Sequence, residues 1–324
     1  MMTSITTDTP HFSATPQQVL VTGGTGFIGQ RLVKALLAEG HGVTVLTRNP
    51  EQGAALFDGR VRCIPRMDAL PASTRIDVIA NLAGARILGW RWTGRRKQAL
   101  LRSRVGTTRQ LVDWIAGAEH KPRLLLSGSA IGYYGVQPRG DAAVLDEASP
   151  AQDIFMSRLC QEWEAAAGEA GRHGVKVVCM RFGLVMGHGG ALPMMLLPIR
   201  LGLGGPLGDG RQWLSWIHVD DLLRAMAFLW RRHAGAAERD MDRDALAYNV
   251  TAPEAVTQRQ FSRTAAALFH RPSFLRTPAW AMHALLGEQG DLLLEGQRVA
   301  PARLEREGFV FRYPTVREAL RDLA

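Results

Sequence analysis

Three regularly spaced glycines are the residues of this 324-residue chain that point most directly to chemistry. Gly23, Gly26 and Gly29 lie between an apolar run, residues 19–22, and an amphipathic run, residues 30–39. In that context the first glycine allows a sharp turn, the second lets the backbone approach a diphosphate, and the third lets a helix pack closely. The helix N-terminus then offers unpaired N–H groups and a positive dipole end to the anion. The spacing therefore predicts a dinucleotide-binding turn.

The end of the next apolar run, residues 42–48, decides which nicotinamide dinucleotide is favoured. A site selective for NAD usually has Asp or Glu there, about 20 residues after the glycines, to bind the ribose hydroxyls. This chain has Thr47 and Arg48 instead. A guanidinium can pair with the 2′-phosphate of NADP, which a carboxylate would repel. These residues favour NADP (NADPH) over NAD; the alternative is an Arg48 side chain that only points into solvent.

A sheet is needed to position these residues, and the pattern of the chain predicts one. Apolar runs typical of buried strands stand at residues 19–22, 42–48, 61–64, 76–83, 123–127, 175–181 and 247–250. Helical patterns fill the intervals, notably at residues 94–116 and 154–170. The alternation predicts the α/β class, with a doubly wound parallel sheet that is covered on both faces and binds its ligand at the carboxyl ends of the strands.

The length of the chain predicts a large domain with a smaller lobe attached. We expect a nucleotide-binding domain over residues 17–185, completed by residues 213–252. The substrate-side lobe is expected to consist of residues 186–212 and 253–324. Residues 1–16 lack an apolar signal core and are predicted to form a flexible tail.

Two further segments are predicted to lie outside helices and strands. The glycine-rich stretch 202–210 is expected to form a loop over the cofactor cleft that closes on substrate. Arg200 and Arg211 flank it and either hold an anionic group or lie on the surface. Residues 234–246 are expected to form an exposed linker.

Composition and charge argue against several classes of protein. The three cysteines are odd in number and show no C-x-x-C spacing, which argues against a disulfide framework or a metal site and suits a cytoplasmic protein. The net charge is +9, but the arginines are dispersed apart from a cluster over residues 86–104. Contacts of that cluster with an anionic cofactor or substrate are favoured over nucleic-acid binding, because no recognition motif accompanies the charge. No apolar run is long enough to span a membrane.

Several motifs together resemble the extended short-chain dehydrogenase/reductase superfamily, which includes the NAD-dependent epimerases and dehydratases. They stand at residues 22–29, 81–84, 126–135, 181–187 and 216–221. Residues 91–93, 103–104, 133–134 and 200–210 resemble more narrowly its atypical branch of epimerase family proteins. The resemblance covers roughly residues 18–320 and implies a Rossmann-like fold, with the small extra C-terminal domain of that branch over about residues 271–320.

The resemblance also implies contacts with the cofactor. The amides of Phe27 and Ile28 would face the diphosphate, and Arg48, beside Thr47, would meet the phosphate of the adenosine ribose. The other implied contacts are Asp68 near the adenine, Leu82, Ala83 and Gly84 beside the nicotinamide ribose, and Leu184 near the carboxamide.

The chemistry departs from the superfamily, whose usual mechanism uses Tyr-x-x-x-Lys on one helix face. The chain has four lysines, and none has a tyrosine four residues before it. The resemblance places Met156 at the tyrosine position and Cys160 at the lysine position, with Glu164 one turn beyond. Cys160 is either a nucleophile or, as its amphipathic helical setting favours, a packed thiol.

The remaining candidates for catalysis lie elsewhere. Ser129 matches the serine that orients substrate in the superfamily, and Tyr133 or Tyr134 could place a phenol near the nicotinamide. Without a cationic neighbour such a phenol would keep a pKa of about 10 and would donate a hydrogen bond rather than act as a base. His218 is expected to be structural or to contact substrate before being catalytic, with Asp220 as the N-cap of the helix that follows.

Three functions are compatible with these residues. The first is an NADP-dependent oxidoreductase or epimerase with a non-standard proton route, acting on an unidentified small molecule that is anionic and resembles a sugar nucleotide. The second is a non-catalytic NADP(H)-binding regulatory protein. A basic nucleic-acid-binding protein is a weaker third. We expect a monomer or homodimer, without a nucleic-acid partner or a membrane.

Overall fold

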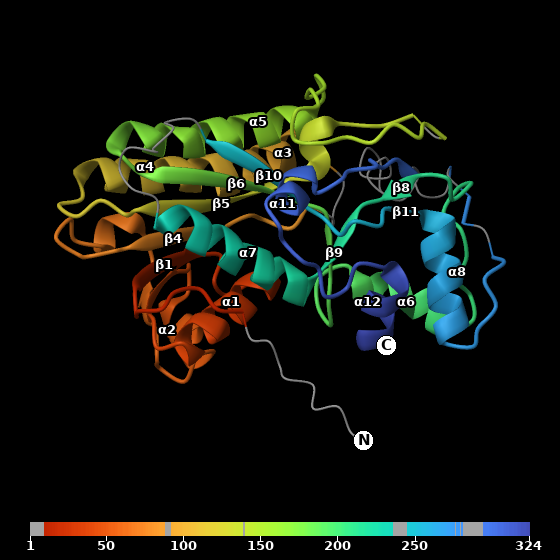
Figure 1. The fold of residues 1–324 in the computed structure, drawn as a ribbon, viewed down its shortest axis with the longest axis horizontal. Helices are drawn as coiled ribbons and strands as arrows, with labels where there is room; N and C mark the ends of the chain where they lie inside the picture. The colour runs from red at the N-terminus through yellow and green to blue at the C-terminus, as the bar shows by residue number, and fades with distance from the viewer. Residues whose placement is uncertain are drawn as a thin grey trace.

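The computed structural model describes residues 10–87, 92–138, 140–235, 245–275, 277–278, 280 and 294–324. A seven-stranded sheet crosses the middle of the molecule (Figure 1), with the strand order β10-β6-β5-β4-β1-β2-β3 and every neighbouring pair parallel. The strands are β1 (Gln18–Thr22), β2 (Gly42–Leu46), β3 (Arg62–Ile64), β4 (Val78–Asn81), β5 (Leu124–Ala130), β6 (Lys176–Phe182) and β10 (Leu246–Val250). The predicted α/β class and doubly wound parallel sheet are confirmed.

Helices cover both faces of the sheet, which explains why its strands are apolar on both sides (Figure 1). Val19 and Val21 of β1 point into a core shared with α1 (Phe27–Ala38) and α7 (Val219–Ala234). Leu20 points the other way, into a core shared with α4 (Thr107–Gly117). Around these lie α2 (Pro50–Ala55) and α5 (Phe155–Gly168), with the 3₁₀ turns η1 (Met67–Ala69), η3 (Ile131–Tyr134) and η4 (Glu169–His173).

The helix expected over residues 94–116 is interrupted. It consists of α3 (Gly94–Leu101), a π-helical turn η2 (Arg102–Gly106), and α4. Thr93 caps α3 by accepting a hydrogen bond from the backbone N–H of Arg96. The π turn widens the helix by one residue and shifts the face on which later side chains lie.

The smaller lobe lies beyond the carboxyl ends of the strands, at the right of Figure 1. Its core is formed by α6 (Leu192–Arg200), α8 (Gln258–Leu268) and α12 (Val316–Asp322). Two short two-stranded pairs join it to the sheet, β7 (Leu184–Met186) with β9 (Trp216–His218) and β8 (Trp213–Leu214) with β11 (Val256–Thr257). The short helix α11 (Ala302–Arg306) lies against β10.

A fully buried carboxylate joins the C-terminal segment to the nucleotide-binding part. Asp221, in the first turn of α7, accepts hydrogen bonds from the backbone N–H groups of Arg312 at 2.9 Å and Tyr313 at 2.8 Å. It also accepts one from Nη1 of Arg224 at 2.7 Å. The carboxylate is thereby satisfied by chain more than ninety residues downstream.

The segment before β1 differs from the expected flexible tail. Phe12 is fully buried and packs edge-on against Trp230 of α7, with ring centroids 5.4 Å apart. Its backbone N–H donates to the carboxylate of Glu39. The tail prediction is therefore wrong for the residues around Phe12. Residues 1–9, most of the predicted linker, and residues 276, 279 and 281–293 of the family-specific segment lie outside the described residues.

The loop 202–210 is held in place at several points. Two backbone hydrogen bonds join the loop to Thr277: the N–H of Gly208 donates to the carbonyl of Thr277, and the N–H of Thr277 donates to the carbonyl of Pro206. The side chain of Gln258, at the start of α8, accepts from the N–H of Leu207. These bonds hold the loop against Thr277 and the start of α8, and its closure on substrate stays a prediction. Among the described residues, no helix has the length and apolar character of a membrane span.

Candidate functional site

The glycine turn brings the end of β1 against the end of β4. Gly23 has φ +69°, a left-handed conformation that favours glycine, and a Cβ at this position would lie 2.6 Å from the carbonyl oxygen of Leu82. A Cβ on Gly29 would lie 2.2 Å from the carbonyl oxygen of Gly23, so this glycine packs on the turn itself. The chain order of the strands reverses between β1 and β4, and ligands of doubly wound sheets bind at this switch point.

Helix α1 begins in the way an anion site requires. Its N-cap is Gly26, which offers no side-chain cap, and its first turn contains no acidic residue. The N–H groups of the first turn are therefore available to an anion. Gly187, Gly189 and Gly190 pack on the ring of Phe27, and this contact fixes the start of the helix. Ile28 packs on the core beneath the sheet. These features fit the diphosphate of a dinucleotide.

The predicted adenosine contacts follow β2 and β3. The N–H of Thr47 donates to the carbonyl of Ile64, so the ends of the two strands lie together. Arg48 is exposed and forms no hydrogen bond or ion pair with the described residues, which leaves it available to a phosphate. Asp68 is also exposed and pairs with Arg66 at 3.1 Å. This arrangement is compatible with a 2′-phosphate on Arg48.

A buried polar network fixes the backbone that follows β4. Thr22 Oγ1 donates to Asn81 Oδ1 at 2.7 Å and accepts from the N–H of Ala83 at 3.1 Å. Asn81 Nδ2 donates to Thr108 Oγ1 at 2.8 Å and to Ser127 Oγ at 3.1 Å. Because each buried group has a partner, the network holds β1, β4 and β5 in one arrangement. Leu82, Ala83 and Gly84 lie above it at the open edge of the sheet.

Leu184 lies at the other side of this edge. It begins β7, and its backbone N–H donates to the carbonyl of Ser215 at 2.9 Å. The structure therefore places it directly after β6, as expected, and partly exposed.

Ser129 belongs to a buried ionic cluster at the carboxyl ends of β5 and β6. Its hydroxyl donates to Glu164 Oε1 at 2.6 Å. Arg181 donates from Nε and Nη2 to the two oxygens of Glu164, at 2.8 Å each, in a bidentate pair. Burial alone would lower the pKa of Arg181, but its hydrogen bonds and attraction to Glu164 outweigh burial and raise it. Arg181 therefore stays charged at neutral pH.

The two tyrosines have a cationic neighbour, so the case of a phenol without one does not apply to them. The guanidinium of Arg181 lies 3.4 Å from the ring centroid of Tyr133, and its Nη1 donates to the hydroxyl of Tyr134 at 3.0 Å. Tyr134 is buried and donates in turn to Asn249 Oδ1 at 2.6 Å. Burial raises the pKa of Tyr134 to about 12 although Arg181 and Asn249 oppose this. Tyr133 is partly exposed and is the accessible phenol of the two.

Met156 and Cys160 are both buried in the face of α5 that packs beneath η3. Burial and the charge of Glu164 raise the pKa of the Cys160 thiol to about 12. Nothing at the usual tyrosine and lysine positions can therefore exchange a proton near neutral pH. The preference for a packed thiol agrees with this environment.

Thiol labelling tests that environment. We expect a thiol reagent at pH 8 to leave Cys160 and Cys179 unmodified in the native protein, because both are 1% exposed and burial raises both pKa values. With a pKa near 12, about one Cys160 thiol in ten thousand would be ionised at this pH. Peptide mass analysis should find label at Cys63 alone, and at all three cysteines after denaturation. Native labelling of Cys160 at the rate of a free thiol would contradict the packed arrangement.

His218 caps α7, a role predicted for Asp220. Its Nδ1 accepts a hydrogen bond from the backbone N–H of Asp220 at 3.1 Å. The remaining proton must then sit on Nε2, which lies 3.3 Å from Asp322 Oδ2. His218, Asp220 and Asp322 lie close enough to resemble a metal site, but a protonated Nε2 and an occupied Nδ1 leave the imidazole no lone pair for a metal. Burial lowers the pKa of His218, which keeps it neutral.

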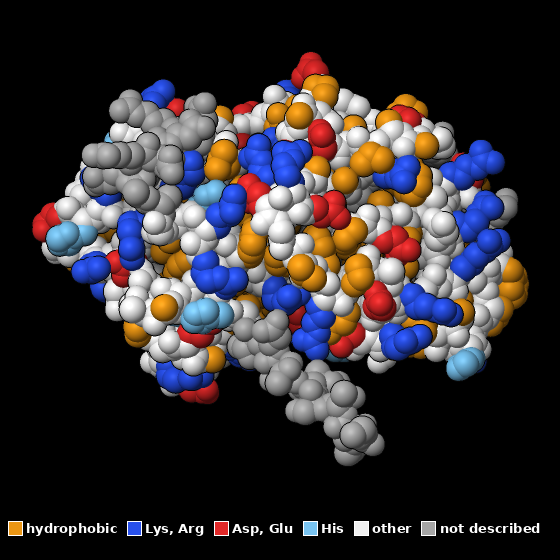
Figure 2. Space-filling model, viewed as in Figure 1, with side chains coloured by type: hydrophobic (Ala, Val, Ile, Leu, Met, Phe, Trp, Pro, Cys, Tyr) orange, Lys and Arg blue, Asp and Glu red, His pale blue; other side chains and the backbone are white. Residues whose placement is uncertain are grey.

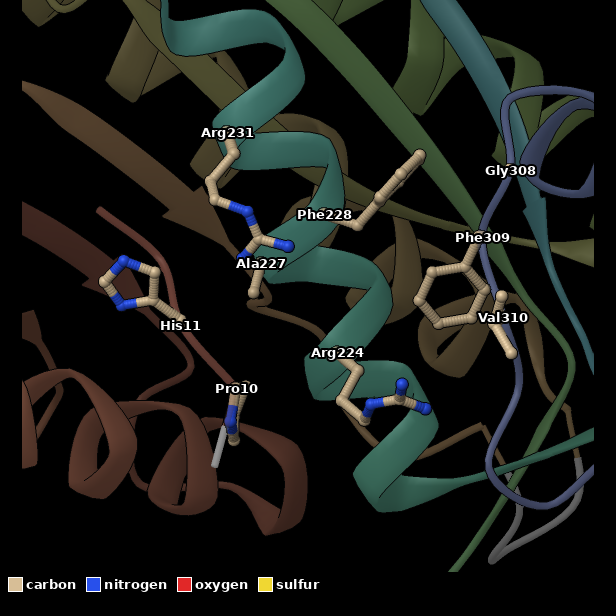
Figure 3. A pocket seen from close by; sticks show the side chains of 9 residues that line it. All are labelled: Pro10, His11, Arg224, Ala227, Phe228, Arg231, Gly308, Phe309 and Val310. Atoms are coloured by element: carbon tan, nitrogen blue, oxygen red, sulfur yellow. The ribbon is translucent and has the colours of Figure 1, made fainter. Parts of the chain in front are cut away.

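A surface hollow of about 390 Å³ lies away from these residues (Figure 3). It is bordered by three segments: the N-terminal residues Pro10 and His11, one side of α7, and residues 308–310. None of the residues predicted to bind cofactor or substrate lines it. The candidate site is therefore the carboxyl edge of the sheet.

The ionic partners of Ser129 and Tyr134 were not predicted. Arg181 stands near the end of an apolar run, residues 175–181, and a charge in a buried strand requires a partner. Glu164 follows Met156 and Cys160 at helical spacing and therefore lies on the same face of α5. The charge in a buried strand and the helical spacing of Glu164 could together have predicted that Arg181 and Glu164 form a pair.

Comparisons with known proteins show which family the chain belongs to. Residues 19–250 match the model of the NAD dependent epimerase/dehydratase family, and residues 277–323 match a domain of unknown function, DUF1731. The epimerase family protein SDR39U1 homolog, chloroplastic, of Arabidopsis thaliana is 37% identical over 312 residues, covering 94% of this chain and 86% of that protein. The epimerase family protein YfhF of Bacillus subtilis is 36% identical over 307 residues, covering 94% and 97%.

A solved structure gives the same result in three dimensions. The crystal structure of human epimerase family protein SDR39U1 (isoform 2) with NADPH matches with a TM-score of 0.80 and 36% sequence identity, covering 95% of this chain and 99% of that chain. The resemblance inferred from the motifs is confirmed. With a family model matched over residues 19–250 and relatives 36–37% identical over most of their length, the chain belongs to the NAD-dependent epimerase/dehydratase family.

Proposed function

We propose that this protein binds NADPH in preference to NADH across the carboxyl ends of β1, β2 and β4. The main support is the uncapped start of α1 behind the Gly23 turn, which fits a diphosphate. Arg48 supplies a free cation where the adenosine ribose would lie. The human relative that was crystallised with NADPH adds independent support for this cofactor.

We further propose that the protein is an oxidoreductase or epimerase acting on a small anionic molecule that resembles a sugar nucleotide. NADPH would supply a hydride when bound. Tyr133, held by the cation on its ring, would donate a hydrogen bond to the substrate oxygen. Ser129 would accept one, because its own proton is engaged by Glu164. The basic side chains are scattered over the face drawn in Figure 2, which favours a small anionic ligand over nucleic acid.

A second function, NADP(H)-dependent regulation without turnover, is favoured by the buried Met156 and Cys160. Calorimetry with NADPH and NADH, followed by incubation of the NADPH-loaded protein with a panel of carbonyl compounds, separates the two. Loss of NADPH absorbance supports catalysis. Tight NADPH binding with no oxidation by any member of the panel supports regulation, and absence of NADPH binding would remove both proposals.

Replacing each tyrosine separately tests the roles of the two phenols. We expect Tyr133→Phe to lower turnover of a substrate found in the panel by at least about tenfold, because it removes an accessible hydrogen-bond donor. Tyr134→Phe should instead lower the free energy of unfolding by about 1–3 kcal/mol, because it leaves buried Asn249 and Arg181 groups without their partner. Steady-state kinetics and denaturant unfolding measure the two effects. The reverse pattern would exchange the roles.

A further inference from the structure

The π-helical turn η2 carries an arginine into the protein. Arg104 is 7% exposed, whereas Arg102, two residues earlier in the same turn, is exposed. The guanidinium of Arg104 lies 5.3 Å from the ring centroid of Trp163. A Cβ on Gly84 would lie 3.0 Å from its Cζ and Nη2, so the charged group rests against the backbone that follows β4. Single π turns occur frequently at functional sites.

A second arginine holds the same loop. Nη2 of Arg104 donates to the carbonyl oxygen of Ala85 at 3.0 Å, and Nη2 of Arg96 donates to the carbonyl oxygen of Arg86. The two guanidinium groups therefore bind consecutive carbonyls. Ser103 completes the attachment, because its Oγ accepts from the N–H of Ala85. The two cations are adjacent, and burial and the charge of Arg96 lower the pKa of Arg104 to about 10.

Neither cation is neutralised. Between Asp77 and Asp113 the sequence has no acidic residue, although it has eight arginines and lysines: Arg86, Arg91, Arg95, Arg96, Lys97, Arg102, Arg104 and Arg109. Arg91 lies outside the described residues. Within the described ranges, Arg96 and Arg104 form no ion pair, and the buried Nε of Arg96 has no hydrogen-bond partner. Arg104 is a cation removed from water without a counter-charge, which is costly, and proteins retain such a group where a ligand supplies the charge; Arg96 is partly buried beside it.

We propose that Arg96 and Arg104 form an anion-binding subsite beside the end of β4, which receives a carboxylate or phosphate group of the substrate. Both groups present oxygens that a guanidinium binds in a bidentate manner. That the ligand is the substrate rests on the proposed function, because it assumes that the nicotinamide ribose lies beside Leu82–Gly84. The existence of the subsite rests only on the two arginines. Cys160 stands at the position of the superfamily's lysine and carries no positive charge. Arg104 would supply a positive charge to the site instead.

Anion titration tests the subsite directly. Acetate and orthophosphate are titrated separately into the full-length protein, with and without saturating NADP, at an ionic strength held constant with chloride. Calorimetry gives the affinity and thermal unfolding gives the midpoint. We expect at least one anion to bind, and Arg104→Met to weaken it by about tenfold or more. Arg102→Met, the exposed neighbour, should leave the affinity within about twofold. Acetate binding alone indicates a carboxylate, and tighter phosphate binding indicates a phosphate.

The stability of the ligand-free variant distinguishes a binding role from a structural one. Arg104→Met should keep or raise the thermal midpoint, because an apolar side chain of similar length replaces an uncompensated buried charge. A lower midpoint together with unchanged anion affinity would overturn the proposal, as would a wild-type protein that binds neither anion. If Arg104→Met fails to fold, Arg96→Met should show the same loss of affinity, and Arg104→Lys, which keeps the charge but not the bidentate geometry, should retain only part of it. NADPH affinity is measured in each variant as well, and failure of the wild type to bind NADPH would count against the proposed function alone.

Discussion

Arg48→Asp is expected to weaken NADPH binding by about 100-fold or more while changing NADH affinity by less than about threefold. The substitution removes a charge-assisted pair with the 2′-phosphate and replaces it with a repulsive carboxylate, and each tenfold loss corresponds to about 1.4 kcal/mol. NADH has a hydroxyl where NADPH has that phosphate, and Asp can accept a hydrogen bond from it. Calorimetric titration of both coenzymes measures the change.

Arg60→Asp is the matched control for this experiment. It makes the same change in net charge at an exposed residue before β3, at the opposite end of the strands from Arg48. Its effect on NADPH affinity should be small, and it should shrink further as salt is added. Equal losses of NADPH and NADH affinity in Arg48→Asp would show that the side chain does not contact the 2′-phosphate. Arg48 would then be a side chain that only points into solvent.

Arg181→Met is expected to lower the free energy of unfolding by about 3–5 kcal/mol, because it leaves the carboxylate of Glu164, which is only 13% exposed, with Ser129 as its remaining donor. Tyr134 also loses a partner. Denaturant unfolding at neutral pH measures the loss. A second change, Glu164→Gln, should restore much of the stability of the Arg181→Met variant, since the unpaired charge disappears.

The exposed ion pair of Arg158 with Asp153, 2.8 Å apart, provides the contrast. Both side chains are mostly exposed, so Arg158→Met should lower the free energy of unfolding by less than about 1 kcal/mol.

Strictly additive losses of unfolding free energy from Arg181→Met and Glu164→Gln would mean that the charges of Arg181 and Glu164 do not stabilise each other.

The sequence was sufficient for the β1–turn–α1 unit because every local preference there agrees with the fold. An apolar run, a left-handed glycine and an amphipathic helix each require the next, and the structure places all three within a few residues of the predicted bounds. The other strands of the sheet were predictable for a related reason. They are buried on both faces, so continuous apolar runs mark them.

The features that sequence reasoning missed depend on contacts between distant parts of the chain. Tyr134 and Arg181 are 47 residues apart, and no local pattern signals that they meet. The π turn was hidden because residues 94–116 keep an overall helical pattern through it. His218 replaced Asp220 as the N-cap because β9 runs directly into α7, leaving the histidine at the boundary.

The long-range bonds of Asp221 have a consequence for biosynthesis. A nascent chain that has emerged from the ribosome only as far as β10 already contains the seven strands and α7, but not the backbone N–H groups of Arg312 and Tyr313. Until those groups are synthesised, the carboxylate at the start of α7 must stay hydrated, which keeps that helix end from docking fully. Helix α7 therefore completes its packing only after Arg312 and Tyr313 have been synthesised.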